Sequence, residues 1–257
     1  MRKGNKLDFY WFLSKDKLLN ECLPYTVGLN EIAFSEMLDY YESIIVKPTV
    51  SSGGGKEIYK VIKLSRGIEV HHRDKRNVFR NKREAFAFIE ESTFGFSRPY
   101  IIQEAIDLLT VDGNPVDFRA IVQRRIDSSE WQVTGKFGKV AKEGFIVTNL
   151  KYHRAGLMSI DEALAALQFT WRDGERILEA MDKVCIRAAE KLQEAFPDKT
   201  MWGLDIGVNH SFQVKIIEVN ANPGNNPFRD LEDDRMHKRI TSIRNYNRLA
   251  RRRRKGY

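Results

Sequence analysis

The sequence contains no hydrophobic run long enough to cross a membrane, and two cysteines are too few for a disulfide framework. The apolar run nearest the start covers residues 9–13, whereas a membrane-spanning helix needs about 20 apolar residues. Polar residues 14–17 follow at once, so a signal-peptide pattern is also missing. Cys22 and Cys185 have apolar helical surroundings and no C-x-x-C spacing. These absences exclude membrane-spanning and disulfide-rich secreted classes, and they predict buried thiols in a reducing compartment, the cytoplasm.

The formal net charge of the chain is +8, but most of the chain is nearly neutral. From Phe228 onward, eleven Lys or Arg and four Asp or Glu give a net charge of +7, which leaves about +1 for the other 227 residues. The basic run at 251–255 is therefore a local feature, and such a run is most often a solvated terminus. A weak, salt-dependent contact with nucleic acid is the alternative interpretation, for this tail alone.

Helix and strand patterns follow one another in an order that predicts an α+β fold with two lobes. The expected helices cover residues 14–21, 31–41, 81–91, a short segment opened by Ser159, and 173–196. The expected strands cover residues 43–48, 58–64, 100–106, 116–122, 131–140 and 144–147. We predict an N-terminal entry segment (1–22), a small lobe (23–103), a large lobe (104–228) and a basic tail (229–257), with a cleft at 103–107.

Two short β-branched runs, 203–208 and 215–224, predict an antiparallel hairpin. Residues two apart in a strand share a face, so Glu218 and Asn220 point the same way, and an even-length loop places Asp205 on that face. Two carboxylates and an amide oxygen on rigid strands suit Mg²⁺, which keeps waters and shares its shell with phosphates. The alternative is a hairpin edge whose polar face simply meets solvent.

A glycine-rich stretch connects the strand that ends in Lys47-Pro48 to the next strand. Its residues are Ser52, Gly53, Gly54, Gly55 and Lys56. Glycines let the backbone approach phosphate oxygens closely, and successive N–H groups form a nest for anions. The stretch is not a P-loop, which needs G-K-[ST] at the start of a helix. A flexible hairpin tip is the alternative interpretation.

Six motifs, in this order and spacing, resemble the ATP-grasp superfamily. They are D-K at 16–17, V-K-P at 46–48 before S-S-G-G-G, Q-E-A-I at 103–106, D-F-R at 117–119, G-L-D-I at 203–206 and E-V-N-A-N-P-G at 218–224. The branch that the chain most resembles is the spore-coat-associated YheC/YheD-like group, and residues 141–150 are also similar to RimK-type glutamate ligases. The resemblance covers about residues 14–228. It implies an ATP-grasp fold, with two α+β lobes and the nucleotide in the cleft between them.

The resemblance also implies roles for individual residues. Lys17 and Lys47 would contact the α- and β-phosphates, and a lid formed by Ser52, Gly53, Gly54, Gly55 and Lys56 would close over the β- and γ-phosphates. Adenine and ribose would be held by Gln103, Glu104, Ala105, Ile106 and Asp107. One or two Mg²⁺ ions, with Mn²⁺ as an alternative, would be held by Asp205, Glu218 and Asn220. The transferred phosphoryl group would be surrounded by Arg119, Lys139, Asn149 and Asn222.

Members of this superfamily typically activate a carboxylate as an acyl-phosphate, which an amine then attacks. The resemblance therefore implies an ATP- and Mg²⁺-dependent ligase that joins small-molecule or peptide carboxylates to amines, in the cytoplasm or associated with the spore. The residues suit this chemistry, because phosphoryl transfer needs charge neutralisation and positioning more than a nucleophile–base pair. The five histidines lack ligand spacing and are expected to be surface or structural residues.

Two other functions fit the same motifs: a small-molecule kinase, and an ATP-binding structural protein of the spore coat. Related ligases usually carry a separate domain before the D-K motif, whereas only 15 residues precede Asp16 here. We therefore expect either a minimal member or a partner chain that completes the acceptor site.

Overall fold

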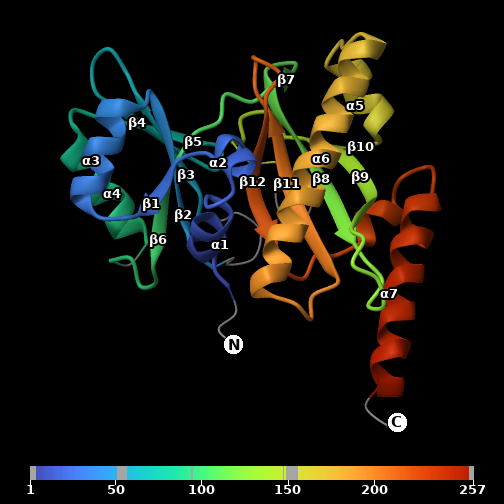
Figure 1. Ribbon diagram of the computed structural model, residues 1–257. Coiled ribbons are helices and arrows are strands. Elements are labelled where there is room, and N and C mark those ends of the chain that lie inside the picture. Colours follow the sequence, from blue (N-terminus) through green and yellow to red (C-terminus); the bar gives the residue numbers. More distant parts are fainter. Residues whose placement is uncertain (1–3, 51–56, 94, 147, 149–155, 255–257) are drawn as a thin grey trace.

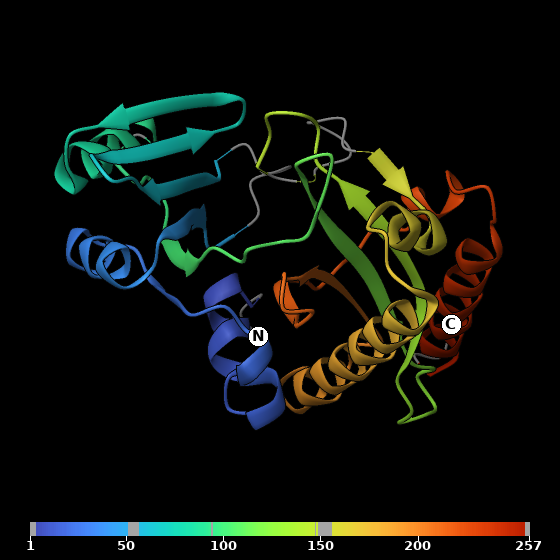
Figure 2. The ribbon, with the colours of Figure 1, turned by 90° about the horizontal axis from the view of Figure 1, so that it is seen from above.

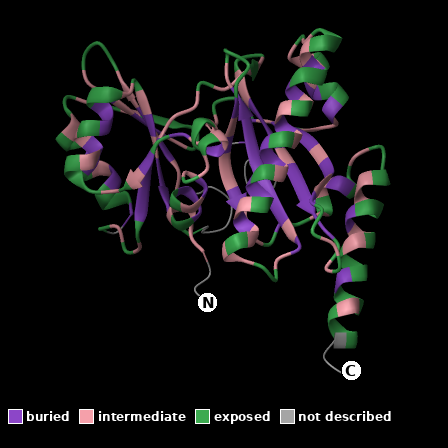
Figure 3. Ribbon diagram, viewed as in Figure 1, coloured by how far each residue is buried: buried purple, intermediate pink, exposed green. Residues whose placement is uncertain are grey.

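Two antiparallel sheets, one in each half of the chain, form the frame of the molecule. The structure is a computed structural model, and it describes residues 4–50, 57–93, 95–146, 148 and 156–254. Each sheet carries helices on its outer side, and the two lobes lie side by side (Figures 1 and 2). The sheets hold most of the buried residues, while the outward faces of the helices are exposed (Figure 3). This arrangement is the α+β architecture that the sequence predicts.

The small lobe is built on a sheet with strand order β1-β6-β2-β3-β4-β5. Its strands are β1 Thr26–Gly28, β2 Ser43–Pro48, β3 Tyr59–Lys63, β4 Ile68–His72, β5 Lys75–Phe79 and β6 Tyr100–Glu104. Its helices are α3 Glu31–Tyr40 and α4 Lys82–Ser92, whose N-caps Asn30 and Asn81 accept hydrogen bonds from backbone N–H groups, as the sequence suggests. Apolar residues of the sheet and of these helices form one core, which includes Phe34, Ile44 and Ile89.

The large lobe is built on a sheet with strand order β10-β9-β8-β11-β12. Its strands are β8 Asn114–Gln123, β9 Gln132–Val140, β10 Gly156–Met158, β11 Met201–Val208 and β12 Val214–Asn220, with β7 Thr110–Val111 paired to β8. Helix α5 Ile160–Ala166 starts with the expected capping box at Ser159, and α6 Trp171–Ala195 packs the apolar stripe that includes Ile177 and Leu192 on the sheet. This core shares no described residue with the core of the small lobe.

Residues 6–22 form two helices, α1 Lys6–Leu13 and α2 Lys17–Cys22, where the sequence indicates only one helix and an entry segment. Phe9, Leu13 and Leu19 lie in the core of the large lobe. Helix α1 also contacts β1 of the small lobe and β12 of the large lobe, so it spans the boundary between them (Figure 1). Phe9, Tyr10 and Leu13 of the apolar run are therefore buried, whereas Trp11 is exposed. The cap of α2 is Asp16 rather than Ser14.

The basic tail is not a free terminus. Residues 226–229 form a 3₁₀ turn and Arg235–Arg254 form the long helix α7 at the outer edge of the large lobe (Figure 1). Ile240 is fully buried against Phe137 and Phe228. Arg251 to Arg253 of the basic run are exposed, as the sequence predicts, but they continue a helix that packs on the large lobe instead of forming a separate tail. Buried Ile240 and Asn247 lie among the charged residues of α7 and attach the helix to the large lobe.

Two smaller differences concern local structure. The strand expected at 144–147 is absent over Gly144–Ile146, where the chain turns with Gly144 at a φ of +79°, and Val147 lies outside the described residues. Cys185 is buried as expected, but Cys22 is only partly buried. Among the described helices, none combines the length and the apolar character needed to cross a membrane.

We expect Asn247→Ala to lower the free energy of unfolding by about 1–3 kcal/mol, because buried backbone groups lose their partners. The Asn247 Oδ1 atom accepts a hydrogen bond from the Ile126 N–H at 2.8 Å, and its Nδ2 donates to the Arg124 carbonyl at 2.9 Å. Urea unfolding measures the change. Asn245→Ala is the control, because Asn245 is an exposed residue of the same helix, and it should cost less than about 0.5 kcal/mol. Equal losses in both variants would mean that the two hydrogen bonds do not hold α7.

Candidate functional site

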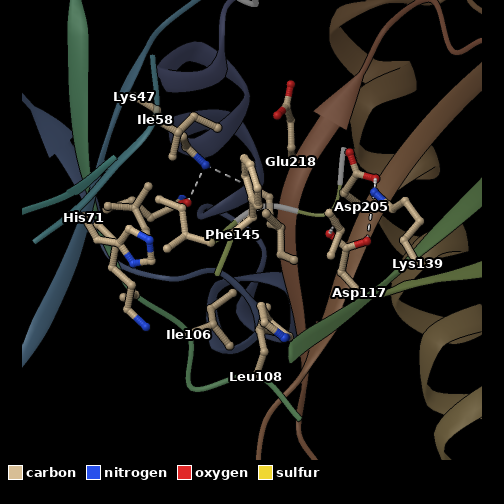
Figure 4. Close-up of a pocket in the computed structure, with 18 of the residues that line it drawn as sticks. Lys47, Ile58, His71, Ile106, Leu108, Asp117, Lys139, Phe145, Asp205 and Glu218 are labelled. Atoms are coloured by element: carbon tan, nitrogen blue, oxygen red, sulfur yellow. Dashed lines mark hydrogen bonds and ion pairs between the residues drawn. The ribbon is translucent and has the colours of Figure 1, made fainter. Parts of the chain in front are cut away.

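A cleft of about 540 Å³ separates the two sheets. Figure 4 shows Lys47 and His71 on the side of the small lobe, opposite Asp117, Lys139 and Asp205 on the side of the large lobe. The connection 104–108 closes one end of the cleft, which is lined there by Glu104, Ala105, Ile106, Asp107 and Leu108. The structure thus brings together the expected hinge and most of the charged residues that the sequence singles out.

Lys47 is almost fully buried at the wall of the cleft, where β2 and β6 run side by side. Its Nζ donates hydrogen bonds to Gln103 Oε1 at 2.6 Å and to the Ile217 carbonyl of the large lobe at 3.3 Å. The Gln103 side chain is fixed in turn by its hydrogen bond to Thr26 Oγ1 at 2.8 Å. Burial, and then the neighbouring Lys6, lower the pKa of Lys47 to about 8, while Glu218 and Asp205 act in the opposite direction.

The expected hairpin is present as β11 and β12, and Asp205 lies directly opposite Glu218 in its register. The register shifts between Asp205 and Ile206, so a bulge adjusts the strand beside the carboxylate. Glu218 and Asn220 line the cleft together with Asp205, as the alternation of the strand predicts. Sequence periodicity alone predicts that Glu218 and Asn220 lie on one side of the strand, because strand residues two apart share a face.

Both oxygens of Asp205 are engaged by neighbouring side chains. Arg119 from β8 donates from Nε to Oδ1 and from Nη2 to Oδ2, both at 2.8 Å, and Lys139 from β9 donates to Oδ1 at 3.0 Å. Asn220 Nδ2 donates to Oδ2 at 3.1 Å. Although burial acts to raise it, the Arg119 and Lys139 charges hold the pKa of the Asp205 carboxyl well below its usual range. Asp205 is therefore ionised and ion-paired at neutral pH.

Asp117 completes this buried network, and it is a site residue that sequence reasoning missed. It lies on the cleft side of β8, two residues before Arg119, and its Oδ1 is 2.8 Å from Lys139 Nζ. Thr148 donates a hydrogen bond to its Oδ2. Burial raises the pKa of Asp117. Burial would lower the pKa of Lys139, but the negative charges of Asp117 and Asp205 outweigh it, so the pKa of Lys139 is raised. The D-F-R motif already placed Asp117 and Arg119 on one face of a strand, which is the signal that could have identified it.

Lys6 is a second cleft residue that sequence reasoning missed. Its Nζ is 3.7 Å from Glu218 Oε2, and both side chains are largely covered. Its backbone N–H donates to the Thr49 carbonyl at 2.9 Å, so α1 is attached to the stem that leads into the glycine-rich stretch. A lone lysine near the start of a chain carries no periodic signal, and only the packing of α1 brings it into the cleft.

His71 also lines the cleft and joins the lobes. Its Nε2 is 2.9 Å from the Gly144 carbonyl, in the turn that follows β9. Burial lowers the pKa of this imidazole. His71 is thus a structural residue that joins the lobes, and it also lines the cleft.

Two of the predicted site residues are not brought into the cleft. Lys17 is exposed at the first turn of α2, because its neighbour Asp16 caps that helix and pairs with Arg187 of α6 at 2.6 Å. Asn222 is exposed beyond the end of β12, and its Oδ1 accepts a hydrogen bond from Lys199 at 3.0 Å. Neither residue lines the cleft. The predicted residues that lie outside the described part of the chain are Ser52, Gly53, Gly54, Gly55, Lys56 and Asn149.

The donor chemistry of the hairpin suits a hard divalent cation that is shared with phosphate. In the described part of the chain, no group of three or more His, Cys, Asp or Glu side chains is placed to hold a metal ion. Asp205, Glu218 and Asn220 supply two carboxylates and one amide, which are oxygen ligands of the kind that Mg²⁺ uses together with waters and phosphates. This set therefore fits Mg²⁺ bound with a phosphate ligand better than Mg²⁺ held by the protein alone.

Comparison with known proteins gives a family match over almost the whole chain. The model of the YheC/D like ATP-grasp family matches residues 2–248. The chain is 23% identical over 231 residues to the endospore coat-associated protein YheD of Bacillus subtilis (strain 168). The aligned region covers 87% of this chain and 49% of YheD. The chain thus spans about half the length of this curated relative.

Similar solved structures share the fold at low sequence identity. D-alanyl-alanine synthetase A from Vibrio cholerae superposes with a TM-score of 0.56 and 13% identity, over 95% of this chain and 64% of the synthetase. The ATP-grasp ligase PsnB, complexed with a phosphomimetic variant of its minimal precursor, Mg and ADP, superposes with a TM-score of 0.51 and 14% identity, over 94% of this chain and 58% of PsnB. The fold is therefore the two-lobed α+β ATP-grasp fold.

Proposed function

The chain belongs to the YheC/D-like ATP-grasp family, and we propose that it is an ATP- and Mg²⁺-dependent ligase that joins a carboxylate to an amine. The observation that carries the proposal is the pairing of Asp205 with Glu218 across the hairpin, on the cleft wall opposite buried Lys47. A cleft with oxygen ligands on one side and an ammonium group on the other suits a metal–polyphosphate complex.

The residues of the cleft would divide the binding of ATP among them. Backbone groups of residues 103–106 would hold adenine, and Asp107 would reach the ribose. Lys47 would bind the phosphates, and Lys6 takes the second phosphate-binding position in place of Lys17, because it lines the cleft. The proposed lid at 52–56 and the proposed contact of Asn149 rest on the order of the sequence motifs.

The reaction would begin when a substrate carboxylate oxygen attacks the γ-phosphorus and ADP leaves, which gives an acyl-phosphate. An amine then attacks the carbonyl carbon, inorganic phosphate leaves, and the amine nitrogen loses a proton. Mg²⁺ bound by Asp205, Glu218 and Asn220 would neutralise charge on the phosphates. Arg119 and Lys139 lie beside these ligands and would hold the oxygens of the transferred phosphoryl group. Asp117 would orient Lys139.

For the substrates, we propose only their chemical classes. The synthetase from Vibrio cholerae is named for the D-alanyl-alanine that it makes, and PsnB was solved with a peptide precursor. We propose small-molecule or peptide carboxylates and amines as substrates here. Because the chain spans about half of YheD, a further chain or segment that completes the acceptor site is part of the proposal. A cytoplasmic location, with spore association as the alternative, remains a prediction.

A phosphate-release screen over amino acids and short acidic peptides, with mass spectrometry of the products, tests the reaction class. A ligase gives an amide product and a small-molecule kinase gives a phosphorylated one. An ATP-binding structural protein of the spore coat gives neither product. Such a protein would have no need of five charged and amide groups facing one cleft (Arg119, Lys139, Asp205, Glu218 and Asn220).

Saturating Mg·ATP is expected to raise the melting temperature, because a ligand that binds only the native protein stabilises it. At about 100 times the dissociation constant, the added stability is about 2.7 kcal/mol. Differential scanning fluorimetry measures the shift, with Mg²⁺ alone as the control. No shift at saturating Mg·ATP would remove the basis of the proposed function.

The affinity for ATP is expected to fall as the pH rises above about 8, because the pKa of Lys47 is lowered to about 8. A bound polyphosphate favours the charged ammonium, so affinity is full below this pKa and is lost above it, by at most about tenfold per pH unit. Titration calorimetry from pH 7 to 9.5 measures the slope. Lys47→Arg stays charged throughout, so the same slope in this variant would exclude Lys47 as its origin.

A further inference from the structure

The two carboxylates of the hairpin are both held by cationic side chains. Asp205 contacts Arg119 and Lys139 within 3.0 Å, and Glu218 contacts Lys6 at 3.7 Å. All of these side chains line the same cleft, and they are at most about one-fifth exposed. A metal ion that used these carboxylate oxygens would have to displace ammonium or guanidinium groups from them.

The charges of the ion-paired side chains balance one another, and buried Lys47 adds one further positive charge to the same cleft. Asp117, Asp205 and Glu218 contribute three negative charges, and Lys6, Arg119 and Lys139 contribute three positive ones. A divalent cation that entered alone would add two uncompensated positive charges in a largely buried place, and a polyphosphate that entered alone would add more negative charge than Lys47 can compensate. Uncompensated charge is costly there because water is mostly excluded. When both ligands bind together, the cation can pair with the carboxylates and the polyphosphate with the cationic side chains, so that no charge is left without a partner.

We propose that Lys6, Arg119 and Lys139 act as an exchangeable set of counter-charges: the polyphosphate takes them over while the divalent cation takes the carboxylates of Asp205 and Glu218. This inference rests on the proposed function, since it concerns the same cleft. Its consequence is that metal and polyphosphate bind with strong positive coupling and that each binds weakly alone. Coupling between two ligands is reciprocal, and it typically amounts to about 5- to 150-fold in affinity.

Titration calorimetry with inorganic probes tests the exchange without adenine or turnover. The probes are Mn²⁺ alone, inorganic tripolyphosphate alone, and the two premixed. We expect the premixed pair to bind wild-type protein about 5- to 150-fold more tightly than either probe alone. Tripolyphosphate is used because it separates the coupling from recognition of the nucleoside.

Lys6→Met provides the decisive variant, because the exchange predicts opposite effects on the two probes. Glu218 loses a competing cation, so Mn²⁺ alone should bind at least about fivefold more tightly, while tripolyphosphate alone should bind more weakly. A merely structural role of Lys6 would weaken both. Lys63→Met is the matched control, since it breaks the Lys63–Glu42 pair outside the cleft and should change neither affinity. Arg119→Met, which removes one of the two cations that pair with Asp205, is the second variant and should shift both affinities in the same directions as Lys6→Met.

The results separate this inference from the proposed function. If Mg·ATP stabilises the protein but Mn²⁺ alone binds wild type as tightly as the premixed pair, the exchange is wrong and the nucleotide site stands. Unchanged Mn²⁺ affinity in both Lys6→Met and Arg119→Met would overturn it as well. If Mg·ATP gives no stabilisation while the coupling with tripolyphosphate appears, the exchange stands and the nucleotide proposal falls.

Discussion

Glu218→Gln is expected to lower the turnover of ATP by about 10²-fold, a larger change than the accompanying rise in the dissociation constant for ATP. The substitution keeps the shape of the side chain but removes the negative charge that faces the cleft opposite Asp205. A proposed metal ligand acts mainly on charge that moves in the transition state, whereas Lys47 and the hinge bind the ground state, so kcat should fall far more than binding. Phosphate release and calorimetry at increasing Mg²⁺ measure the two quantities.

Two further variants separate a metal ligand from a surface carboxylate. Glu42→Gln makes the same change at an exposed residue outside the cleft, and should leave turnover unaltered. Asn220→Asp retains an oxygen donor and adds a charge, so it should alter the preference between Mg²⁺ and Mn²⁺ more than it abolishes binding. Wild-type turnover in Glu218→Gln would mean that Glu218 holds no metal ion that turnover requires, and the functional proposal would lose its main support.

Arg119→Met is expected to lower the free energy of unfolding by about 3 kcal/mol. It removes the two 2.8 Å hydrogen bonds that the guanidinium donates to Asp205 and leaves a buried carboxylate with Lys139 and Asn220 only. Because Lys139 still pairs with Asp205, we expect a loss of stability at the lower end of the range for a broken buried ion pair. Urea unfolding at pH 7 gives the value.

The double variant Arg119→Met/Asp205→Asn shows whether the loss in free energy of unfolding comes from the buried charge of Asp205. Neutralising Asp205 should restore part of the stability, because the buried carboxylate that has lost one of its two cations is then no longer charged. Arg125→Met is the matched control, since Arg125 forms a bidentate pair with Asp127 on the exposed surface, and it should cost less than about 1 kcal/mol. If Arg119→Met were no more costly than Arg125→Met, the buried network would not contribute to stability.

The sequence predicts best those parts of the site that depend on strand alternation. The face shared by Asp205, Glu218 and Asn220 follows from a period of two, and the structure places all three at one cleft. The helices 31–41 and 81–91 and the capping box at Ser159 are also as expected, because their signals are local. The roles of these site residues remain proposals.

Features that depend on tertiary packing could not be predicted in this way. Lys6 enters the cleft only because Phe9 and Leu13 dock α1 on the large lobe. The docking of α7 depends on Ile240 and Asn247, two buried positions two turns apart within a stretch that is otherwise dominated by arginine. Lys17 shows the opposite error, since a motif position that fits a family pattern lies on the outside of its helix. A single sequence can show which side of a helix is apolar, but not which element that side meets.

The separate cores of the two lobes have a consequence for the cooperativity of unfolding. Among the described contacts that join the lobes, several end on backbone carbonyls, at Ile217, Thr49 and Gly144, and water can replace such partners at little cost. Each lobe can therefore lose its packing while the other keeps its own, so a single melting temperature need not describe the free protein. A ligand that contacts both walls of the cleft would couple these two units and merge their transitions into one.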